Sequence, residues 1–250
     1  MIAFFKRTAL AAVVFGLHLQ AAANTHNTTK YKTNLPPSVE LSYTIKAKQK
    51  GIPVDGNAVM RWNVEAGRFT ATNEARAMLV GKILDARSEG TIDGYGLAPA
   101  NFTEKRFRKE QTTTTFDRAA GTIRFSASEQ TYPIKGGEQD RNSVIWELVA
   151  VARATPARVK PGTTWNFFVA GLRDAEPWTF KVVKQEKMRT PLGELQTLHI
   201  TKVPPPDSQD QRLDIWLAPS LDWFPARLRF SDDNGDYIEQ TLQKLDKKAS

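Results

Sequence analysis

The residue that comes nearest to a catalytic candidate in this chain is a histidine. Hydrolysis by a nucleophile needs the nucleophile, a base and a group that orients the base. His199 alternates with Leu198 and Ile200 in LQTLHITKV, so it faces the more polar side of a predicted strand. The chain contains no GxSxG, SxxK or HExxH motif. A lone strand histidine is typical of a structural or solvated residue.

A second candidate pair is Asp140 and Ser143 in QDRNS, an acidic residue and a hydroxyl residue that could serve as acid and nucleophile. A helix cap explains the same pair, because aspartate commonly precedes a helix and serine is common in its first turn. We favour the cap. A hydrolase would require His199 or Asp140 to meet a serine in space, so the sequence predicts a protein that is not an enzyme and has no catalytic residues.

Metal binding is not predicted either. The chain has no cysteine, which excludes thiol catalysis and cysteine-ligated metals. Several aspartates fall in turns and loops, but they lack the glycine and the terminal glutamate of an EF-hand. We therefore predict no metal and no cofactor. These aspartates include Asp207, Asp210, Asp214, Asp232, Asp233 and Asp236.

Aromatic residues give the main indication of binding. In RLDIWLAP, Trp216 lies opposite three aliphatic residues, and in TTWNFFVAGL, Phe168 lies opposite Trp165 and Phe167. A strand that is apolar on both faces needs two partners: the core, and a helix, a ligand or a protein surface. Burial under a helix is one interpretation, and an apolar cavity is the other. The candidate ligand-lining residues are Trp62, Trp146, Phe168 and Trp216.

The stretch EKRFRKE, residues 104–110, places Phe107 among four basic residues. It would suit anionic headgroups or glycans. It would equally suit a solvated edge strand whose charges prevent pairing with another sheet. We favour the edge strand.

Most of the chain alternates between apolar and polar residues with the period of a β-strand. In VELSYTIKAK, Leu41, Tyr43 and Ile45 share one face, and in NAVMRWNVEA, Met60 and Trp62 do so. Short turns separate these segments, and DDNG near the C-terminus has the Asn-Gly pair of a tight hairpin. The pattern predicts about a dozen strands in a meander.

One segment has helical spacing instead. In QDRNSVIWELVAVAR, Val144, Ile145, Leu148, Val149 and Ala152 recur at intervals of three and four, which predicts an amphipathic helix at about 140–153. Its apolar stripe would plug a concave sheet. The opposite face, predicted to stay in water, carries Arg141, Glu147 and Arg153.

A single helix cannot supply the crossovers of a parallel sheet. The predicted fold class is therefore mainly β: a large, antiparallel, strongly curved sheet forming an open or spiral-like barrel, with one amphipathic helix packed on it.

The N-terminus has the pattern of a cleavable signal peptide. Lys6 and Arg7 precede an apolar run from Thr8 to Leu19, which is too short to span a bilayer, and Ala21 to Ala23 provide a cleavage signal. We predict cleavage between Ala23 and Asn24, with no transmembrane segment in the mature chain. No cysteine follows the run, which excludes a lipid-anchored lipoprotein.

The predicted organisation is a signal peptide at 1–23, a flexible leader at 24–37, one β-barrel-like domain at 38–246 and a tail at 247–250. The whole chain has a net charge of +8. Because an exported protein meets little nucleic acid, we read this charge as an aid to solubility and predict no nucleic-acid partner.

Four phrases carry a resemblance to a known family: SEGTIDGYGLAPANFTEKR, GGEQDRNSVIWEL, TPLGELQTLHI and IWLAPSLDWFPARLRFSDDNGDYIEQTL. In this order they resemble the domain-of-unknown-function family 3108 of exported Gram-negative proteins, from about Leu41 to Leu242. The resemblance implies a periplasmic location, a curved antiparallel sheet and no established activity. More distantly, the chain resembles periplasmic lipoprotein-sorting carriers, which enclose acyl chains between a concave sheet and several helices; here one helix is predicted.

The leading functional hypothesis is therefore a non-enzymatic periplasmic binding protein that holds an apolar or lipid-like molecule on the concave face of the sheet. The alternative is a cell-envelope integrity factor that binds an envelope protein or peptidoglycan. Its surfaces would be the predicted strand edge at 102–110 and the loop at 204–211.

Overall fold

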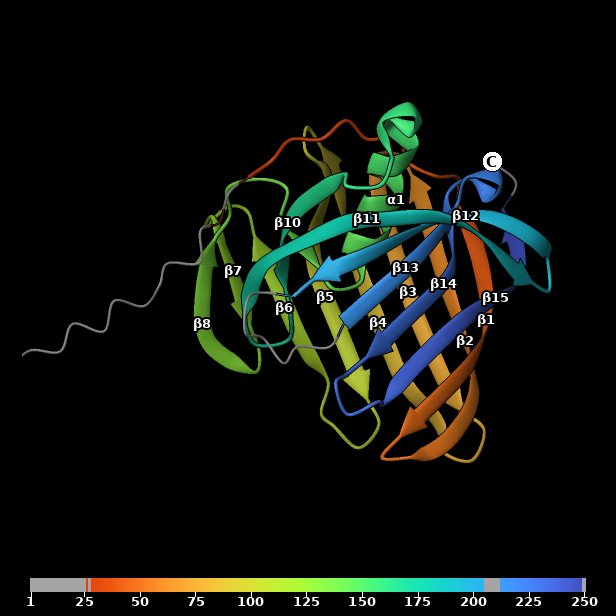
Figure 1. Cartoon of the computed structure of the whole chain (residues 1–250). Coiled ribbons are helices and arrows are strands. Elements are labelled where there is room, and N and C mark those ends of the chain that lie inside the picture. The colour runs from red at the N-terminus through yellow and green to blue at the C-terminus, as the bar shows by residue number, and fades with distance from the viewer. Residues whose placement is uncertain (1–25, 27, 205–211, 249–250) are drawn as a thin grey trace, which may run out of the picture.

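The computed structural model describes residues 26, 28–204 and 212–248. These residues form one large curved sheet with a single α-helix on its concave side (Figure 1). The predicted signal peptide and its cleavage site lie outside the described residues, so both remain predictions.

The strands on the N-terminal side of the helix are β1 (Val39–Gln49), β2 (Ile52–Glu65), β3 (Arg68–Ala77), β4 (Gly81–Asp93), β5 (Gly96–Arg106), β6 (Thr112–Asp117), β7 (Thr122–Phe125), β8 (Ser128–Pro133) and β9 (Gln139–Asp140). The helical elements are α1 (Ser143–Ala154) and the short 3-10 helices η1 (Pro156–Arg158) and η2 (Pro219–Leu221). The later strands are β10 (Thr164–Ala170), β11 (Ala175–Thr190), β12 (Gly193–Val203), β13 (Arg212–Ala218), β14 (Phe224–Ser231) and β15 (Tyr237–Lys247).

The sheet is a meander in two arms that meet at β1 and β15. From β1 the chain runs outward to β8 and crosses to the opposite edge at β9. Helix α1 follows, and the chain then returns along β10 to β15. Every pair is antiparallel except β9 and β10. β8 and β9 are the two edges, so the backbone ladder does not close into a barrel. The predicted open, curved antiparallel sheet is confirmed, with fifteen strands where about a dozen were expected.

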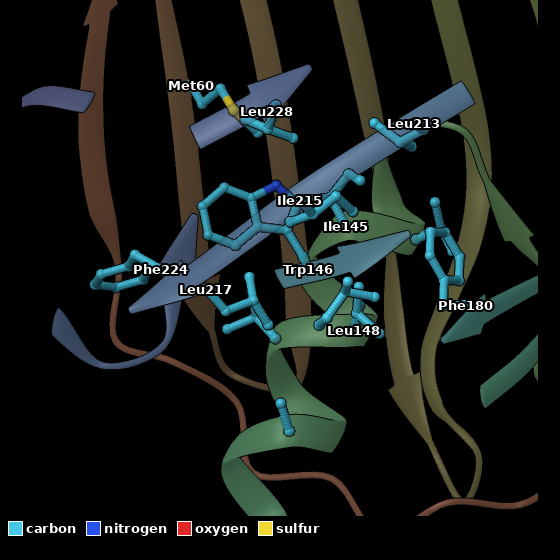
Figure 2. Packing of buried hydrophobic residues seen from close by; sticks show 14 of the residues in the cluster. Met60, Ile145, Trp146, Leu148, Phe180, Leu213, Ile215, Leu217, Phe224 and Leu228 are labelled. Carbon is cyan, nitrogen blue, oxygen red and sulfur yellow. The ribbon is translucent and has the colours of Figure 1, made fainter. Parts of the chain in front are cut away.

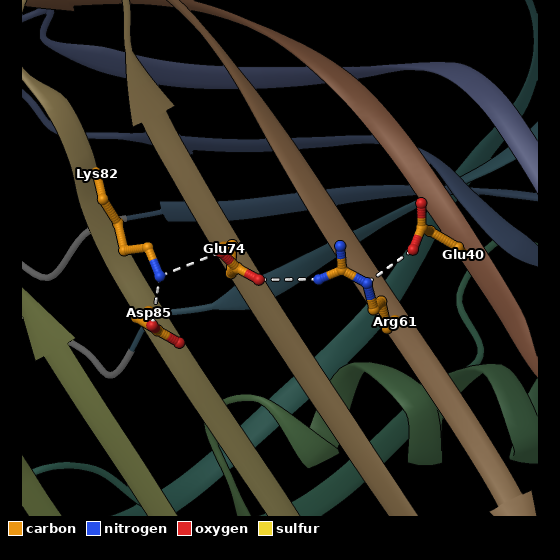
Figure 3. A network of polar contacts seen from close by, with 5 residues as sticks. All are labelled: Glu40, Arg61, Glu74, Lys82 and Asp85. Atoms are coloured by element: carbon orange, nitrogen blue, oxygen red, sulfur yellow. Dashed lines mark hydrogen bonds and ion pairs between the residues drawn. The ribbon is translucent and has the colours of Figure 1, made fainter.

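Alternation along the strands sorts the side chains between a dry inner face and a wet outer face. On β1, Leu41, Tyr43 and Ile45 are buried while their neighbours are not. The outer face of β1–β4 instead carries a chain of ion pairs (Figure 3). Arg61 donates to Glu40 and Glu74 at 2.7 and 2.9 Å, and Lys82 pairs with Glu74 at 3.2 Å. The inner face of these strands is thus the one that must be covered.

Helix α1 covers part of that inner face and has almost no contact with water, because the sheet curves around it. Residues 143–152 are all buried. Of the side chains predicted to stay in water, Arg141 is exposed and Arg153 is partly buried. The prediction for Glu147 was wrong: its exposed fraction is 1%.

The helix begins three residues later than predicted, but Asp140 does prepare its start. Asp140 Oδ1 accepts hydrogen bonds from the backbone N–H groups of Asn142 and Ser143, each at 2.8 Å. These bonds satisfy two donors that the first helical turn leaves free. The helix ends at Ala154, two residues before Pro156, since a residue that precedes proline avoids the helical conformation.

The main core lies between α1 and the inner face. Trp146 from the helix stacks on Trp62 of β2 with ring centres 5.0 Å apart. It meets Phe224 edge-on at 6.3 Å (Figure 2). The two strands with apolar residues on both faces, β10 and β13, each pack against the main core on one face and a smaller cluster on the other, as expected. Phe168 packs in a second cluster with residues of β6 and β7, and Trp216 borders a third on the outer face.

The segment before β1 also packs on the fold. Asn34 N–H donates to the carbonyl of Ala150 at 2.9 Å, and the Pro36 carbonyl accepts from Trp62 Nε1 at 3.0 Å. Nearer the start, the Tyr31 hydroxyl accepts from the Asn166 N–H at 2.8 Å. These contacts hold residues 31–36 beside α1 and β10. The predicted domain boundaries remain predictions.

The basic stretch at 104–110 is not on an edge strand, so that prediction was wrong. Its first three residues belong to β5, which pairs with both β4 and β6. The remainder forms the turn before β6. The charges in this stretch therefore do not protect a sheet edge. Most of the second predicted surface, the loop at 204–211, lies outside the described residues.

Candidate functional site

The concave face has two parts, which we call the helix-covered half and the cavity half. The helix-covered half is packed by α1 and contains Trp62, Trp146, Leu148, Leu217 and Phe224. The cavity half lies beyond the N-terminal end of α1, where no helix covers the sheet. Here a cavity of about 530 Å³ remains between the two arms of the sheet. Its walls include Ile45, Met60, Asn73, Ala75, Ile83, Leu84, Ala86, Phe102, Ile145, Trp178, Leu213, Leu228, Phe230, Ile238 and Gln240.

The cavity exists because inward-facing residues in this half are small or lie across from each other without a helix between them. Ala75 on β3 and Ala86 on β4 leave space on one arm, and Leu228 on β14 faces it from the other. The lining is mainly apolar. A volume of this size falls in the usual range for small-molecule sites.

Two carboxamides interrupt the apolar lining. Gln240 on β15 is 5% exposed, and its Oε1 has no hydrogen-bond partner within the described residues. Asn73 Oδ1 on β3 is buried and equally without a partner there. An unpaired buried amide destabilises the fold, because it has lost its hydrogen bonds with water. Both residues belong to the cavity lining.

Five charged side chains also line the cavity, and we call this set the charged mouth: Glu104, Arg106, Arg141, Glu176 and Lys202. Glu104 pairs with Arg106, and Lys202 pairs with Glu176 at 3.2 Å. The Lys202 ammonium also lies 4.3 Å from the centre of the Trp178 ring. Arg141 is exposed and forms no ion pair with the described residues. The mouth can therefore hold the polar end of a molecule whose apolar part lies within.

Two buried carboxyl groups fix α1 at the border between the halves. Asp140 accepts a hydrogen bond from Ser88 of β4, and Glu147 accepts one from the Leu97 N–H of β5 at 2.8 Å. Burial raises the pKa of Asp140 to about 6, although its hydrogen bonds with Ser88 and Ser143 act in the opposite direction. Burial raises the pKa of Glu147 to about 8. Both groups anchor the helix and lie outside the cavity lining.

The four predicted ligand-lining residues lie in three different places. Trp62 and Trp146 are stacked in the helix-covered half, next to the cavity residues Met60 and Ile145. Phe168 packs on β6 and β7. None of the four is among the residues that line the cavity. Their direct contact with a ligand stays a prediction.

Trp216 lies on the outer face, partly exposed, in a second and smaller depression. His199 stacks on its ring with the two planes 3° apart, and Trp216 Nε1 donates to Glu186 Oε1 at 2.8 Å. His199 Nε2 lies 2.8 Å from Asp214 Oδ1. Histidine, carboxylates and tryptophan thus form one partly buried cluster on the outer face.

The components of a hydrolase do not come together. Asp140 meets Ser88 and Ser143, but all three side chains are fully buried. His199 contacts carboxylates and an aromatic ring on the other side of the sheet. No hydrogen bond within the described residues joins a histidine to either serine. Within the same residues, no group of three or more metal-ligating side chains is found.

Sequence reasoning missed the residues of the charged mouth and the two carboxamides. A signal was present: Gln240 stands between Ile238 and Leu242 at an inward position, and Asn73 stands between Ala71 and Ala75. A polar residue at an inward position of a strand costs stability unless something pairs with it, so such an interruption is a sequence signal of a candidate site.

The fold and the cavity together define a β-barrel-like protein with a partly filled concave face. The chain belongs to the family described as protein of unknown function (DUF3108), whose model matches residues 42–243. A search of the curated proteins finds no significant match.

Among solved structures, the chain is similar to a β-barrel-like protein of the domain of unknown function DUF1849 from Brucella abortus. The two are 15% identical over 87% of this chain and 100% of that chain, with a TM-score of 0.60, which shows a shared fold. A provisionally named outer membrane lipoprotein-sorting protein domain from Vibrio parahaemolyticus is 8% identical over 86% of each chain, with a TM-score of only 0.28. A DUF1329 family protein from Desulfovibrio piger has a TM-score of 0.31.

Proposed function

We propose that this chain is a non-enzymatic periplasmic protein that binds an apolar or amphipathic, lipid-like molecule in the cavity half of its concave face. The observation that carries the proposal is the mainly apolar cavity of about 530 Å³, which α1 leaves unfilled. Burying a ligand's apolar surface there would remove that surface from water, which favours binding in proportion to the area buried. The N-terminal signal pattern supports the location.

The polar groups around the cavity define the kind of ligand. Arg106, Arg141 and Lys202 at the charged mouth favour a polar or anionic end, and Glu104 and Glu176 already pair with two of them. Deeper inside, Gln240 and Asn73 offer hydrogen bonds to a hydroxyl or amide. An amphipathic molecule with its polar end at the mouth satisfies both sets of groups.

Titration with the fluorescent fatty acid cis-parinaric acid tests the proposal. Ala75→Trp places a large side chain in the cavity, and we expect it to weaken binding by about tenfold or more, since steric exclusion removes the buried contacts. Ala86→Phe provides a second filling variant from β4.

Thr70→Trp is the matched control, because Thr70 lies on the same strand as Ala75 but on its outer face. Thermal unfolding of each variant establishes that it is folded. Folded filling variants that bind the probe as tightly as the control would exclude the cavity as the binding site.

A further inference from the structure

Three turns lie at the end of the sheet opposite α1 (Figure 1), and each exposes large apolar side chains. In the β3–β4 turn, Leu79 is 99% exposed and Met78 78% exposed. Ile52 after the β1–β2 turn is 65% exposed, and Phe107 in the β5–β6 turn 43%. We call these the apolar tips. Elsewhere in the described part of the chain, the exposed large apolar side chains are Val183, Leu192 and Val203, each near 40% or below.

The apolar tips lie side by side. Because the strands alternate in direction, the turns after β1, β3 and β5 fall at the same end of the sheet. Backbone hydrogen bonds connect neighbouring hairpins: Met78 N–H donates to the Asp55 carbonyl and Phe107 N–H to the Ile83 carbonyl, each at 3.0 Å. The tips therefore form one surface.

Folding does not require apolar residues at these positions. Turns favour glycine, asparagine, aspartate and serine, whose conformations and hydrogen bonds suit them. The turns at the opposite end follow this rule, with Gly67 between β2 and β3 and Gly94 between β4 and β5. Leu79, almost fully exposed, cannot contribute to the core. A cluster of exposed apolar residues marks an interaction surface.

Basic residues surround the apolar tips. They include Lys48, Lys50, Lys105, Arg108 and Lys109, and none of these forms an ion pair with another described residue. The acidic β14–β15 turn lies beside Lys50, whose backbone N–H donates to Asp236 at 2.6 Å, and it bounds the basic area on that side. The surface thus combines exposed apolar side chains with basic side chains that form no ion pair with the described residues.

We propose that the apolar tips dock on a bilayer that contains anionic phospholipids. Apolar side chains would enter the boundary between headgroups and acyl chains, while the lysines and arginines meet lipid phosphates. Docking places the cavity near the bilayer, because Ile83, Leu84 and Arg106 line the cavity and directly flank two of the tips. The docking surface stands on its own exposure and charge, whether or not the cavity holds a ligand.

Co-sedimentation of the mature chain with vesicles tests this surface. We expect binding to vesicles of phosphatidylethanolamine and phosphatidylglycerol, little binding to phosphatidylcholine, and weaker binding as salt rises. Leu79→Glu should weaken binding to the anionic vesicles about tenfold or more. Leu192→Glu is the matched control, since Leu192 is also an exposed turn residue, between β11 and β12.

Charge reversal provides an independent variant. Lys105→Glu with Lys109→Glu should lower binding at least about tenfold, as each basic residue adds to the attraction of an anionic surface. Lys184→Glu with Lys187→Glu makes the same change in net charge on β11 and should leave most binding intact. All of these positions are at the surface, so the variants should fold.

Several results would overturn the docking surface. These are wild-type protein that stays in the supernatant, tip variants that bind like their controls, and equal binding to neutral vesicles. Retention by lipopolysaccharide or peptidoglycan without binding to phospholipid would also overturn it and identify a glycan partner. Because Leu79 does not line the cavity, Leu79→Glu should bind cis-parinaric acid normally, which separates a failure here from a failure of the proposed ligand site.

Discussion

The helix-covered half and the cavity half share one inner face and one alternating sequence pattern, yet they are packed differently. Trp146 in the first fits between Trp62 and Phe224, and aromatic contacts hold it on two sides. Leu228 and Ala75 in the second face open space. The difference shows that an inward-facing apolar residue can belong either to a core or to a binding site. What decides between them is whether a second element covers it.

Paired leucine truncations test the comparison most strongly. Leu217→Ala in the helix-covered half should lower the free energy of unfolding by about 3–5 kcal/mol, since it creates a new cavity in a packed region. Leu228 borders an existing cavity, so Leu228→Ala should lower the free energy of unfolding by about 1–2 kcal/mol less than Leu217→Ala does. Chemical denaturation measures both, and equal losses would mean that the two halves are packed alike.

The pH dependence of stability tests how tightly α1 is buried. In the folded chain the pKa of Glu147 is raised to about 8, against about 4.5 for an unperturbed glutamate. Between these values the folded state keeps a proton that the unfolded state has lost, so stability falls as pH rises through this window and levels off above it. Glu147→Gln removes an ionisation that costs about 3 kcal/mol at pH 7.

Urea unfolding of both proteins at pH 4, 7 and 8.5 checks this prediction. The variant should match the wild type at pH 4 and be more stable at pH 7 and 8.5. If the difference in unfolding free energy between the two proteins is the same at all three pH values, Glu147 reaches water and α1 is not enclosed on that face.

Two buried glutamines give the smallest and most selective contrast. Both have an unpaired Oε1 within the described residues, but Gln139 Nε2 in β9 donates to the Leu97 carbonyl at 2.7 Å, whereas the Gln240 side chain in the cavity half forms no hydrogen bond with another described residue. Gln139→Met should destabilise the fold by about 1–2 kcal/mol, and Gln240→Met should stabilise the ligand-free protein by about 1 kcal/mol. Thermal unfolding measures the direction of each stability change. A loss of stability in Gln240→Met would mean that the Gln240 amide has a structural partner.

Much of the fold follows from local sequence patterns. The alternation of Leu41, Tyr43 and Ile45 predicts a strand and its buried face, because successive strand residues point to opposite sides. The spacing of Val144, Ile145 and Leu148 predicts the helix. Both predictions are confirmed, since they depend only on the geometry of neighbouring residues.

The errors arose where a prediction needed to know what lies across space. Glu147 falls on the polar face of the helical pattern, yet the curved sheet encloses that face as well. The basic residues at 104–110 suggest an edge, but β6 pairs beyond β5 and moves the edge to β8. The four predicted ligand-lining residues stay a prediction, because an apolar pattern does not show which inward residues border free volume: Trp62 and Trp146 stack on each other, whereas Gln240 lines the cavity.

The sequence by itself determined the strands, the single helix, the meander order and the family, because periodicity and turn residues act over a few neighbouring positions. The tertiary structure alone decided how much of the inner face the helix covers, which inward residues border free volume and which turns meet at one end of the sheet. Those features depend on the curvature of fifteen paired strands, which no local pattern encodes.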